Sequence, residues 1–441
     1  MKDFRGARLA KKAVVSVDQL SIDLGREHEP VPDSLTWEGR EHIVAGLFAG
    51  IGGVERGLQY AGHESRLLCE NDPSAIAVLE KHFSEIPLHG DVRTLDRLPA
   101  GTTLLAAGFP CQDLSQAGTT TGIGGARSGL VAEVFRLLEK HRTPWVLLEN
   151  VPFMLQLGRG EAMHVIATEL ERLGYRWAYR VVDTRSFGLP QRRRRVYVVG
   201  TLDAKADPRN VLFADEAEPA EPVSPSRAAV ARGFYWTEGT RGLGWAEDAI
   251  PTLKGGSAVG IPSPPAIYMP NGQIVTPDIR DAERLQGFPA YWTQPAEAVG
   301  KRSLRWKLVG NAVSVPTARW IGSRLAKPGK RLDFETKALK GHRHWPTAAW
   351  NVGEGRMCVF ASEWPVRKKY HSLESFLKFE PVLLSAKATS GFLSRAEVSG
   401  LRFEAGFLDA IRAHLKGMGG YVPRDRGGRE GQKDVPVSNA A

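Results

Sequence analysis

One stretch of the sequence decides the fold: Ile43-Val44-Ala45-Gly46-Leu47-Phe48-Ala49-Gly50-Ile51-Gly52-Gly53. It joins an apolar run to a cluster of glycines, and an amphipathic stretch follows at residues 54–60. This order predicts a strand, a tight turn and a helix, with glycines that let a ligand approach the backbone. A turn of this kind can also serve only the close packing of strand and helix.

The same alternation of apolar runs and amphipathic stretches continues on the carboxyl side. It predicts an α/β fold built on an open parallel sheet. Strands are expected near residues 43–48, 67–69, 103–107, 145–148, 178–182 and 196–199, and helices near residues 54–60, 130–140 and 163–173.

The pattern changes along the chain and predicts several segments. The sheet domain is expected at residues 42–200 and, after a Pro-, Gly- and Ser-rich inserted module at 201–278, again at 279–327. The flanking segments are a leader at 1–41, an extension at 328–416 and a Gly/Arg-rich tail at 417–441, expected to be disordered. Within the extension, four apolar residues share one helical face: Phe407, Leu408, Ile411 and Leu415.

The net charge of +10 and the sequence pI of about 9.5 indicate a polyanionic partner or simply a soluble surface. From Pro328 onward there are 19 Lys and Arg against 12 Asp and Glu, so most of the excess lies in the last quarter. This asymmetry favours a region that faces nucleic acid.

Other compositional features exclude several classes of protein. No apolar run approaches the roughly 18 residues of a membrane helix, and the first residues lack the pattern of a secretory signal. The three cysteines, Cys69, Cys111 and Cys358, form no CxxC pair, which argues against a disulfide framework or a zinc site. A reducing cytoplasm is the expected location, with no metal.

Polar residues at expected strand ends suggest a nucleoside-containing ligand. Glu70 lies twenty residues after Gly50, at the end of the second strand, where a carboxylate can accept hydrogen bonds from ribose hydroxyls. Asp91, near the third strand, is a candidate for an adenine amino group or for a turn.

Two further groups are expected at the same edge. Cys111 follows the strand at 103–107, and although a lone cysteine is more often inert, Pro110 and the polar, Gly-rich stretch after it are typical of an active-site loop. Glu149 ends the apolar strand at 145–148, where it is a candidate catalytic carboxylate, a helix cap or the partner of an arginine.

A run of arginines opens the strand at 196–199. It reads Gln191-Arg192-Arg193-Arg194-Arg195, and its alternation places Arg193 and Arg195 on the same face. Such a run attracts phosphate, unless it is a solvated basic segment or a localisation signal.

Together these stretches resemble the DNA (cytosine-5) methyltransferase family of the bacterial modification type, over residues 42–326. Six motifs of that family occur in the family's order, which chance would not supply. They are Leu47-Phe48-Ala49-Gly50-Ile51-Gly52-Gly53, Pro110-Cys111-Gln112, Glu149-Asn150-Val151, Gln191-Arg192-Arg193-Arg194-Arg195, Arg284-Leu285-Gln286-Gly287-Phe288-Pro289 and Gly310-Asn311-Ala312-Val313.

The resemblance implies a Rossmann-like, S-adenosylmethionine-dependent sheet domain with a smaller target-recognition domain inserted at 201–278. The residues it places around the cofactor are Phe48, Ala49, Gly50, Gly52, Gly53, Glu70, Asp91, Val92, Leu130, Asn311 and Val313. It also implies a cytoplasmic monomer that acts on double-stranded DNA, with a cognate nuclease or other defence protein as a candidate partner.

The implied mechanism begins with the thiolate of Cys111, which adds to C6 of a flipped-out cytosine so that C5 attacks the donor methyl group. Glu149 is expected to hold the N3 and amino edge of the base, and Arg193 and Arg195 to fix the base and nearby phosphates. The loop that starts at Gln112 is expected to promote flipping. Loss of the C5 proton and of Cys111 releases 5-methylcytosine.

The expected target-recognition domain carries the family's Thr252-Leu253 pair. Candidates for groove or phosphate contacts there are Tyr235, Trp236, Arg241 and Lys254, although such residues also pack small domains. In the extension, the Arg367-Lys368-Lys369 run and the amphipathic stretch near Phe407 either contact flanking DNA or brace the domain.

The chain departs from the family at two positions. Gly46 stands where most relatives carry Asp before Leu-Phe-Ala-Gly, so one cofactor-side hydrogen bond is not expected from this position. Asn71 replaces an aromatic residue that several relatives stack near the adenine.

Three rival functions account for only part of these motifs. An RNA cytosine-5 methyltransferase typically carries a Cys-Phe-Thr motif, which is absent. A catalytically silent DNA-binding homologue commonly loses the Cys or the Glu-Asn-Val motif, and both are present. A nicotinamide-dependent oxidoreductase leaves Pro110-Cys111-Gln112 and the arginine run without a use.

Overall fold

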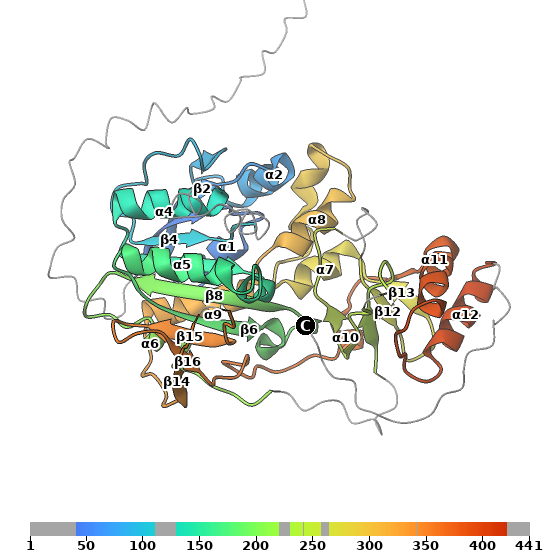
Figure 1. The fold of residues 1–441 in the computed structure, drawn as a ribbon. Helices are drawn as coiled ribbons and strands as arrows, with labels where there is room; N and C mark the ends of the chain where they lie inside the picture. Colours follow the sequence, from blue (N-terminus) through green and yellow to red (C-terminus); the bar gives the residue numbers. More distant parts are fainter. Residues whose placement is uncertain are drawn as a thin grey trace, which may run out of the picture.

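The computed structural model describes residues 41–110, 129–219, 230–240, 242–256, 264–341 and 343–420. In that part of the chain, ten strands form one mixed sheet in the order β14-β16-β15-β6-β8-β5-β4-β1-β2-β3 (Figure 1). The strands are β1 (Ile43–Leu47), β2 (Glu64–Cys69), β3 (Leu88–His89), β4 (Leu104–Ala107), β5 (Trp145–Asn150), β6 (Arg176–Asp183), β8 (Arg194–Thr201), β14 (Thr336–Ala338), β15 (Ala348–Asn351) and β16 (Met357–Val359).

Alternation along the strands builds a core on each face of this sheet. On β4, Leu105 and Ala107 pack with helices α4 (Leu130–His141) and α5 (Glu161–Arg172), whereas Leu104 and Ala106 face the opposite side. That second face is covered by α1 (Gly53–Gln59), α6 (Arg209–Leu212) and α9 (Val315–Ala326). The expected α/β fold is therefore confirmed.

The sheet is parallel only in part. Strands β3, β2, β1, β4 and β5 pair in parallel, but β8 lies antiparallel between β5 and β6. The apolar runs of β6 and β8 are buried on both faces, which is also typical of parallel strands, so the direction of β8 was not readable from composition.

A smaller sheet forms the second part of the molecule. Within the described residues its five strands are β10 (Ala246–Glu247), β9 (Arg232–Phe234), β12 (Ala266–Tyr268), β13 (Ile274–Thr276) and β17 (Val382–Leu383). Helices α11 (Ala386–Glu397) and α12 (Phe407–Gly417) pack against it (Figure 1). The ring centroids of Phe392 and Phe407 lie 5.2 and 5.1 Å from that of Phe234.

The remaining elements lie between or beside the strands of the two sheets. They are α2 (Pro73–His82), α7 (Ile279–Leu285), α8 (Leu304–Asn311), α10 (Leu373–Phe376), the short strand pair β7 (Gln191–Arg192) and β11 (Ile250–Pro251), and three 3-10 helices, η3 (Pro152–Leu155), η4 (Thr184–Phe187) and η5 (Gln294–Ala298), counted over the described residues. Leu285 of α7 and Val309 of α8 are buried with residues of the smaller sheet such as Ile267.

Two of the expected segment boundaries are wrong. Residues 328–416 form no extension of their own, because β15 pairs with β6 of the large sheet and β17 pairs with β13 of the small one. Residues 201–219 belong with the large sheet, since Val211 and Leu212 lie in its core. The leader and the tail fall outside the described residues, apart from Glu41 and residues 417–420.

The helical face expected near Phe407 is confirmed. Phe407, Ile411 and Leu415 of α12 are buried against the small sheet, and Leu408 packs at the edge of the same cluster. The stretch therefore braces this part of the molecule.

Candidate active site

The glycine turn after β1 has the left-handed backbone that its sequence suggests. Gly50 and Gly52 have φ of 54° and 82°, and Phe48, which is not a glycine, has φ of 55°. An aromatic residue in this region is uncommon and is held there by its surroundings. The N–H of Ala49 donates to the carbonyl of Cys69, at 3.1 Å, which ties the turn to the end of β2.

Gly53 starts α1 and allows the last motif to approach. A Cβ atom at Gly53 would lie 2.3 Å from the carbonyl oxygen of Val313, so only glycine fits. The turn and the Gly310–Val313 motif, 260 residues apart in the sequence, are therefore adjacent in the fold.

Glu70 lies where the sequence predicted it, at the end of β2 and beside the turn. Its carboxylate accepts hydrogen bonds from the backbone N–H of Gly50 at 2.7 Å and of Asn71 and Asp72 at 2.9 Å each. These contacts fix the orientation of the carboxylate. Its expected contact with ribose stays a prediction.

Asp91 forms a turn after β3. Its carboxylate accepts from the backbone N–H of Arg93 at 2.9 Å and forms an ion pair with the Arg93 side chain at 2.8 Å, which lowers the pKa of Asp91. Val92 is buried, and Leu130, at the start of α4, packs at the edge of the same core. The contact of Asp91 with adenine and those of Val92 and Leu130 with the cofactor stay predictions.

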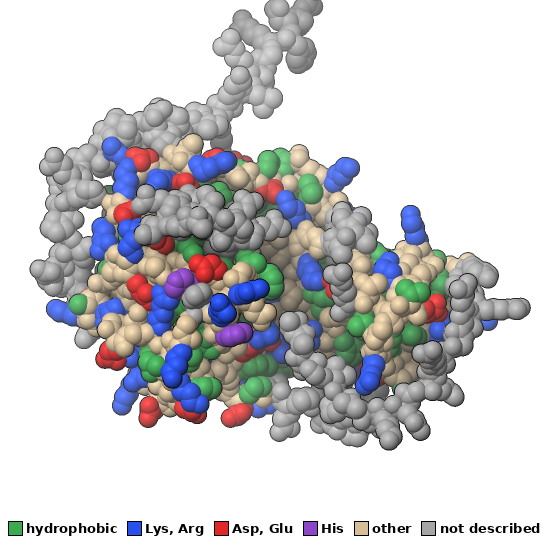
Figure 2. Space-filling view, viewed as in Figure 1, with side chains coloured by type: hydrophobic (Ala, Val, Ile, Leu, Met, Phe, Trp, Pro, Cys, Tyr) green, Lys and Arg blue, Asp and Glu red, His purple; other side chains and the backbone are tan. Residues whose placement is uncertain are grey.

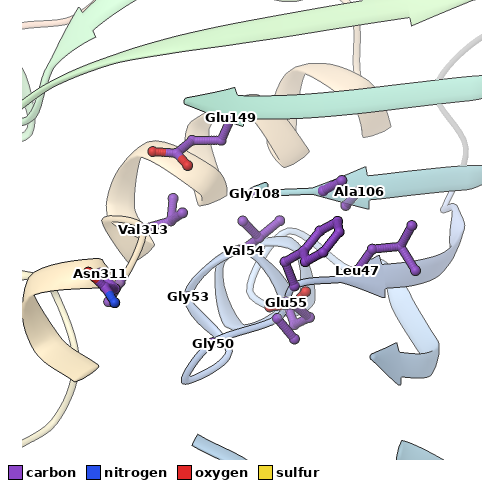
Figure 3. A pocket seen from close by; sticks show the side chains of 14 residues that line it. Leu47, Gly50, Gly53, Val54, Glu55, Ala106, Gly108, Glu149, Asn311 and Val313 are labelled. Carbon is purple, nitrogen blue, oxygen red and sulfur yellow. The ribbon is translucent and has the colours of Figure 1, made fainter. Parts of the chain in front are cut away.

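A pocket joins the glycine turn, the ends of β4 and β5 and the last motif (Figure 3). It is lined by Leu47, Phe48, Ala49, Gly50, Gly53, Val54, Glu55, Ala106, Ala107, Gly108, Glu149, Asn311, Ala312 and Val313. Among the residues expected at the cofactor, Gly52, Glu70, Asp91, Val92 and Leu130 are not part of this lining. Glu55 lines it and was not expected.

Glu149 is held at the end of β5 by an arginine. Nε of Arg195 lies 3.0 Å from Oε1 of Glu149, and about a tenth of each side chain is exposed. Burial raises the pKa of the Glu149 carboxyl, although Arg195 and Arg193 oppose this. Figure 3 shows the carboxylate directed toward Val313. The sequence had left open a pairing with arginine, and the structure shows that pairing at the pocket wall.

Asn150 connects β5 with the segment that leads to the cysteine. Its Nδ2 donates to the carbonyl of Phe109 at 3.0 Å, and its Oδ1 accepts from the N–H of Val151 at 2.8 Å. Sequence reasoning gave Asn150 no role of its own; a buried amide directly after Glu149 was the available signal. Cys111 and Gln112 lie outside the described residues.

Arg193 does not face phosphate, as the sequence had suggested, but is buried between three segments. Its guanidinium donates to the carbonyls of Leu253 at 3.0 Å, Gly310 at 3.2 Å and Ala312 at 2.6 Å. The arginines of the run therefore lie in different environments. Arg193 is buried, whereas Arg194 forms an ion pair with Glu363, in which Nε and Oε2 lie 2.6 Å apart.

Gln191 strengthens the same junction. Its Oε1 accepts from the N–H of Leu253 at 3.0 Å, and its Nε2 donates to the carbonyl of Leu285 at 2.8 Å. Oγ1 of Thr252 donates to the carbonyl of Arg192 at 2.7 Å. The Thr-Leu pair thus anchors the smaller sheet to the arginine run.

The aromatic candidates of the smaller sheet make structural contacts. Tyr235 donates to the carbonyl of Thr252 at 2.7 Å, and Trp236 donates to the carbonyl of Pro264 at 2.9 Å. Nζ of Lys254 lies 3.8 Å from the ring centroid of Tyr235 and also pairs with Glu238. Arg241 lies outside the described residues. The packing alternative therefore accounts for these contacts of Tyr235 and Trp236.

The basic run Arg367-Lys368-Lys369 packs through its backbone while its side chains are exposed. Lys368 donates its N–H to the carbonyl of Ser186 at 2.9 Å, and a Cβ on Gly188 would lie 2.3 Å from the carbonyl oxygen of Lys369. The side chains of Arg367, Lys368 and Lys369 are exposed.

The described residues contain no group of three or more His, Cys, Asp or Glu side chains placed to hold a metal ion. No helix in this part of the chain is long and apolar enough to cross a membrane.

The α/β sheet, the strained glycine turn and the carboxylate–arginine pair at one pocket define an enzyme that binds a nucleoside-containing cofactor beside a reactive site. The C-5 cytosine-specific DNA methylase family model matches residues 43–227. The Type II methyltransferase M2.BsuMI of Bacillus subtilis (strain 168) is 49% identical over 80% of this chain and 92% of its own length. M.BsuFI of Bacillus subtilis, also a Type II methyltransferase, is 38% identical over 67% of this chain and 74% of its own length.

The chain therefore belongs to the C-5 cytosine-specific DNA methylase family. It is a DNA (cytosine-5) methyltransferase, and its cofactor is S-adenosylmethionine. The family expected from the six motifs is confirmed.

Proposed function

We propose that Cys111, Glu149 and Arg195 are the residues responsible for methylating the DNA substrate. Gln112 belongs to the loop that follows the nucleophile. The observation that supports this most directly is the Glu149–Arg195 pair, with its atoms 3.0 Å apart, at the wall of the pocket that also contains the glycine turn. S-adenosylmethionine supplies an electrophilic methyl group at this pocket.

The chemistry requires electrons to reach C5 of cytosine. The Cys111 thiolate forms a bond to C6, and the displaced electron pair makes C5 nucleophilic. Glu149 holds N3 and the amino group of the base, and burial raises the pKa of its carboxyl, which makes it a better proton donor and acceptor for N3. After methylation, the C5 proton leaves to a base and the C6–S bond breaks.

Arg195 has a positioning role in this proposal. Its ion pair fixes the Glu149 carboxylate in one direction, while Arg193 holds the backbone of the segments on either side. Both arginines act through the groups that they orient, so the proposal replaces the earlier expectation of phosphate contacts for Arg193.

We also propose a division of labour between the two sheets. The large sheet performs the chemistry, and the smaller one, completed by β17, α11 and α12, reads the target sequence in duplex DNA. On the face in Figure 2, Lys and Arg side chains are spread over both parts with Asp and Glu among them. DNA bound across both parts would meet basic side chains from each.

The biological setting that we propose is DNA modification in the cytoplasm by a monomer. The relatives named above are Type II methyltransferases, which supports a role beside a cognate nuclease. Light scattering of the purified protein measures its molar mass and so tests whether it is a monomer. Bisulfite sequencing of DNA from cells that express the protein identifies the modified sequence.

The mechanism is tested with DNA that carries 5-fluorocytosine at the modified position. Because fluorine cannot leave C5 as the proton does, the C6–S bond persists and a covalent complex accumulates. We expect this complex with the wild type and with Cys358→Ser, a matched control on β16, but not with Cys111→Ser. Formation of the complex by Cys111→Ser would refute the assignment of Cys111 as the nucleophile. Methylation of RNA in place of DNA would refute the assignment of DNA as the substrate.

A further inference from the structure

The space beside Gly46 is filled by a carboxylate from a different element. A Cβ atom on Gly46 would lie 2.2 Å from Oε1 and 3.1 Å from Cδ of Glu55, which belongs to the first turn of α1. No side chain at position 46 is compatible with Glu55 in this conformation. The space that a side chain at position 46 of β1 would fill is therefore occupied by an acid from the helix.

Glu55 is a buried carboxylate with an unused oxygen. Its residue is only 2% exposed, and Oε2 has no hydrogen-bond partner among the described residues. Burial raises its pKa to about 7, and the charge of Glu70 adds to this. A buried carboxylate of this kind is unfavourable unless a cation or a donor meets it.

The position of Glu55 indicates which group that is. It lines the same pocket as Phe48, Gly50 and Glu149, and its side chain lies beside the glycine turn in Figure 3. Glu149 lines the same pocket but is paired with Arg195, whereas the charge of Glu70 acts on Glu55 from outside the lining. The cofactor carries two cationic groups, the sulfonium and the ammonium of its methionine part.

We propose that Glu55 binds the ammonium group of the methionine part of S-adenosylmethionine, in place of an acid on β1. The proposal rests on the cofactor assignment and adds a binding residue that the motifs did not suggest. The ammonium is the better partner because it donates hydrogen bonds, whereas a methylated sulfonium does not.

A structural role is the alternative. An acid in the first turn of a helix stabilises its N-terminus, and Glu55 lies in the first turn of α1. In that case, substitution would weaken all ligands of the pocket alike or none. Ligand selectivity separates the two roles.

The test compares Glu55→Gln with the wild type by calorimetry, without DNA, using two ligands. S-adenosylhomocysteine keeps the ammonium but has no sulfonium charge, and 5′-methylthioadenosine lacks the whole amino-acid part. We expect the Kd for S-adenosylhomocysteine to rise by about ten- to a hundredfold, as for loss of one charge-assisted hydrogen bond. The Kd for 5′-methylthioadenosine should change by less than about twofold.

The matched control is Glu64→Gln, which makes the same chemical change at an exposed ion pair on β2. It should bind both ligands like the wild type. Equal weakening of both ligands in Glu55→Gln, including loss of both through misfolding, or no weakening at all, would overturn the proposal. Failure of the wild type to bind either ligand would instead contradict the cofactor assignment.

Two further measurements bear on the same claim. Wild-type affinity for S-adenosylhomocysteine should fall by about tenfold per pH unit below pH 7, because binding requires ionised Glu55. Glu55→Gln keeps Glu70 and Glu149 and should still lose this dependence; a dependence that persists in this variant would contradict its assignment to Glu55. The double variant Gly46→Asp with Glu55→Ala places the acid on β1 and should bind S-adenosylhomocysteine with a Kd within about fivefold of the wild-type value. If this variant bound only 5′-methylthioadenosine, an acid on β1 could not replace Glu55 and the proposal would be refuted.

Discussion

Replacing Arg193 with methionine tests whether this arginine holds together the three chain segments that meet beside the pocket. The guanidinium is fully buried and donates to three backbone carbonyls, those of Leu253, Gly310 and Ala312, at 2.6–3.2 Å. Methionine keeps much of the aliphatic volume but removes every donor. The three carbonyls then stay buried without this partner.

The magnitude follows from that loss. A hydrogen bond from a charged donor contributes about 1.5–3 kcal/mol, and removing one partner of a buried charged contact typically destabilises by about 3–5 kcal/mol in all. Burial already lowers the pKa of Arg193 to about 9, with Arg195 as the second cause, so the site carries a desolvation penalty that these contacts and the charge of Glu149 offset. We expect a decrease of about 3–5 kcal/mol in the free energy of unfolding.

The assay is urea unfolding followed by tryptophan fluorescence and circular dichroism. Arg194→Met is the matched control, because the Arg194 side chain is 39% exposed and its pair with Glu363 should contribute at most about 1 kcal/mol. An Arg193→Met protein within about 1 kcal/mol of the wild type would refute the reasoning. Similar losses in both variants would show that the buried contacts have no special weight.

Three other outcomes are expected. Glu149→Gln should lower the rate of methyl transfer by about a hundredfold or more while S-adenosylhomocysteine binding, measured by calorimetry, stays unchanged; a rate within tenfold of the wild type would contradict a role in proton transfer. Phe392→Ala should destabilise the smaller sheet by about 3–5 kcal/mol, because this ring packs on Phe234, and so weaken DNA binding in a mobility-shift assay without changing cofactor affinity. His42 is buried, and burial followed by the charge of His63 lowers its pKa from 6.5 to about 3, so the stability that its neutral form contributes is complete above pH 6.5 and is lost as the pH falls toward 3. Between about pH 6 and pH 4, the free energy of unfolding of His42→Phe should therefore fall by about 1.4 kcal/mol less per pH unit than that of the wild type. Equal slopes of unfolding free energy against pH in the two proteins would exclude this titration.

The sequence predicted the parts of the fold that depend on local pattern. The strands at β1, β2, β4 and β5 and the helices α4 and α5 follow from apolar periodicity, and the glycine turn follows from the residues that permit φ above zero. The position of Glu149 also follows, because a carboxylate directly after a buried strand must lie at the edge of the sheet.

What the sequence did not reveal depends on contacts between distant segments. Strands β14, β15, β16 and β17 are two to four residues long and carry little periodicity, and only pairing with β6 and β13 defines them. The burial of Arg193 depends on carbonyls that are 60 to 119 residues away. The sequence did not predict Glu55 as a pocket residue, because its position depends on the space left by the absent side chain of Gly46.

Residues 382–417 complete the smaller sheet, and this constrains how the sheet can be exchanged between related enzymes. A graft that moved only residues 230–276 from one enzyme to another would leave the ring of Phe234 without Phe392 and Phe407. In the proposed division of labour, target recognition therefore depends on two separate stretches of the chain, residues 230–276 and residues 382–417. Exchange between two such genes must therefore carry both stretches together, and during synthesis the smaller sheet is completed only after every strand of the large sheet has been made.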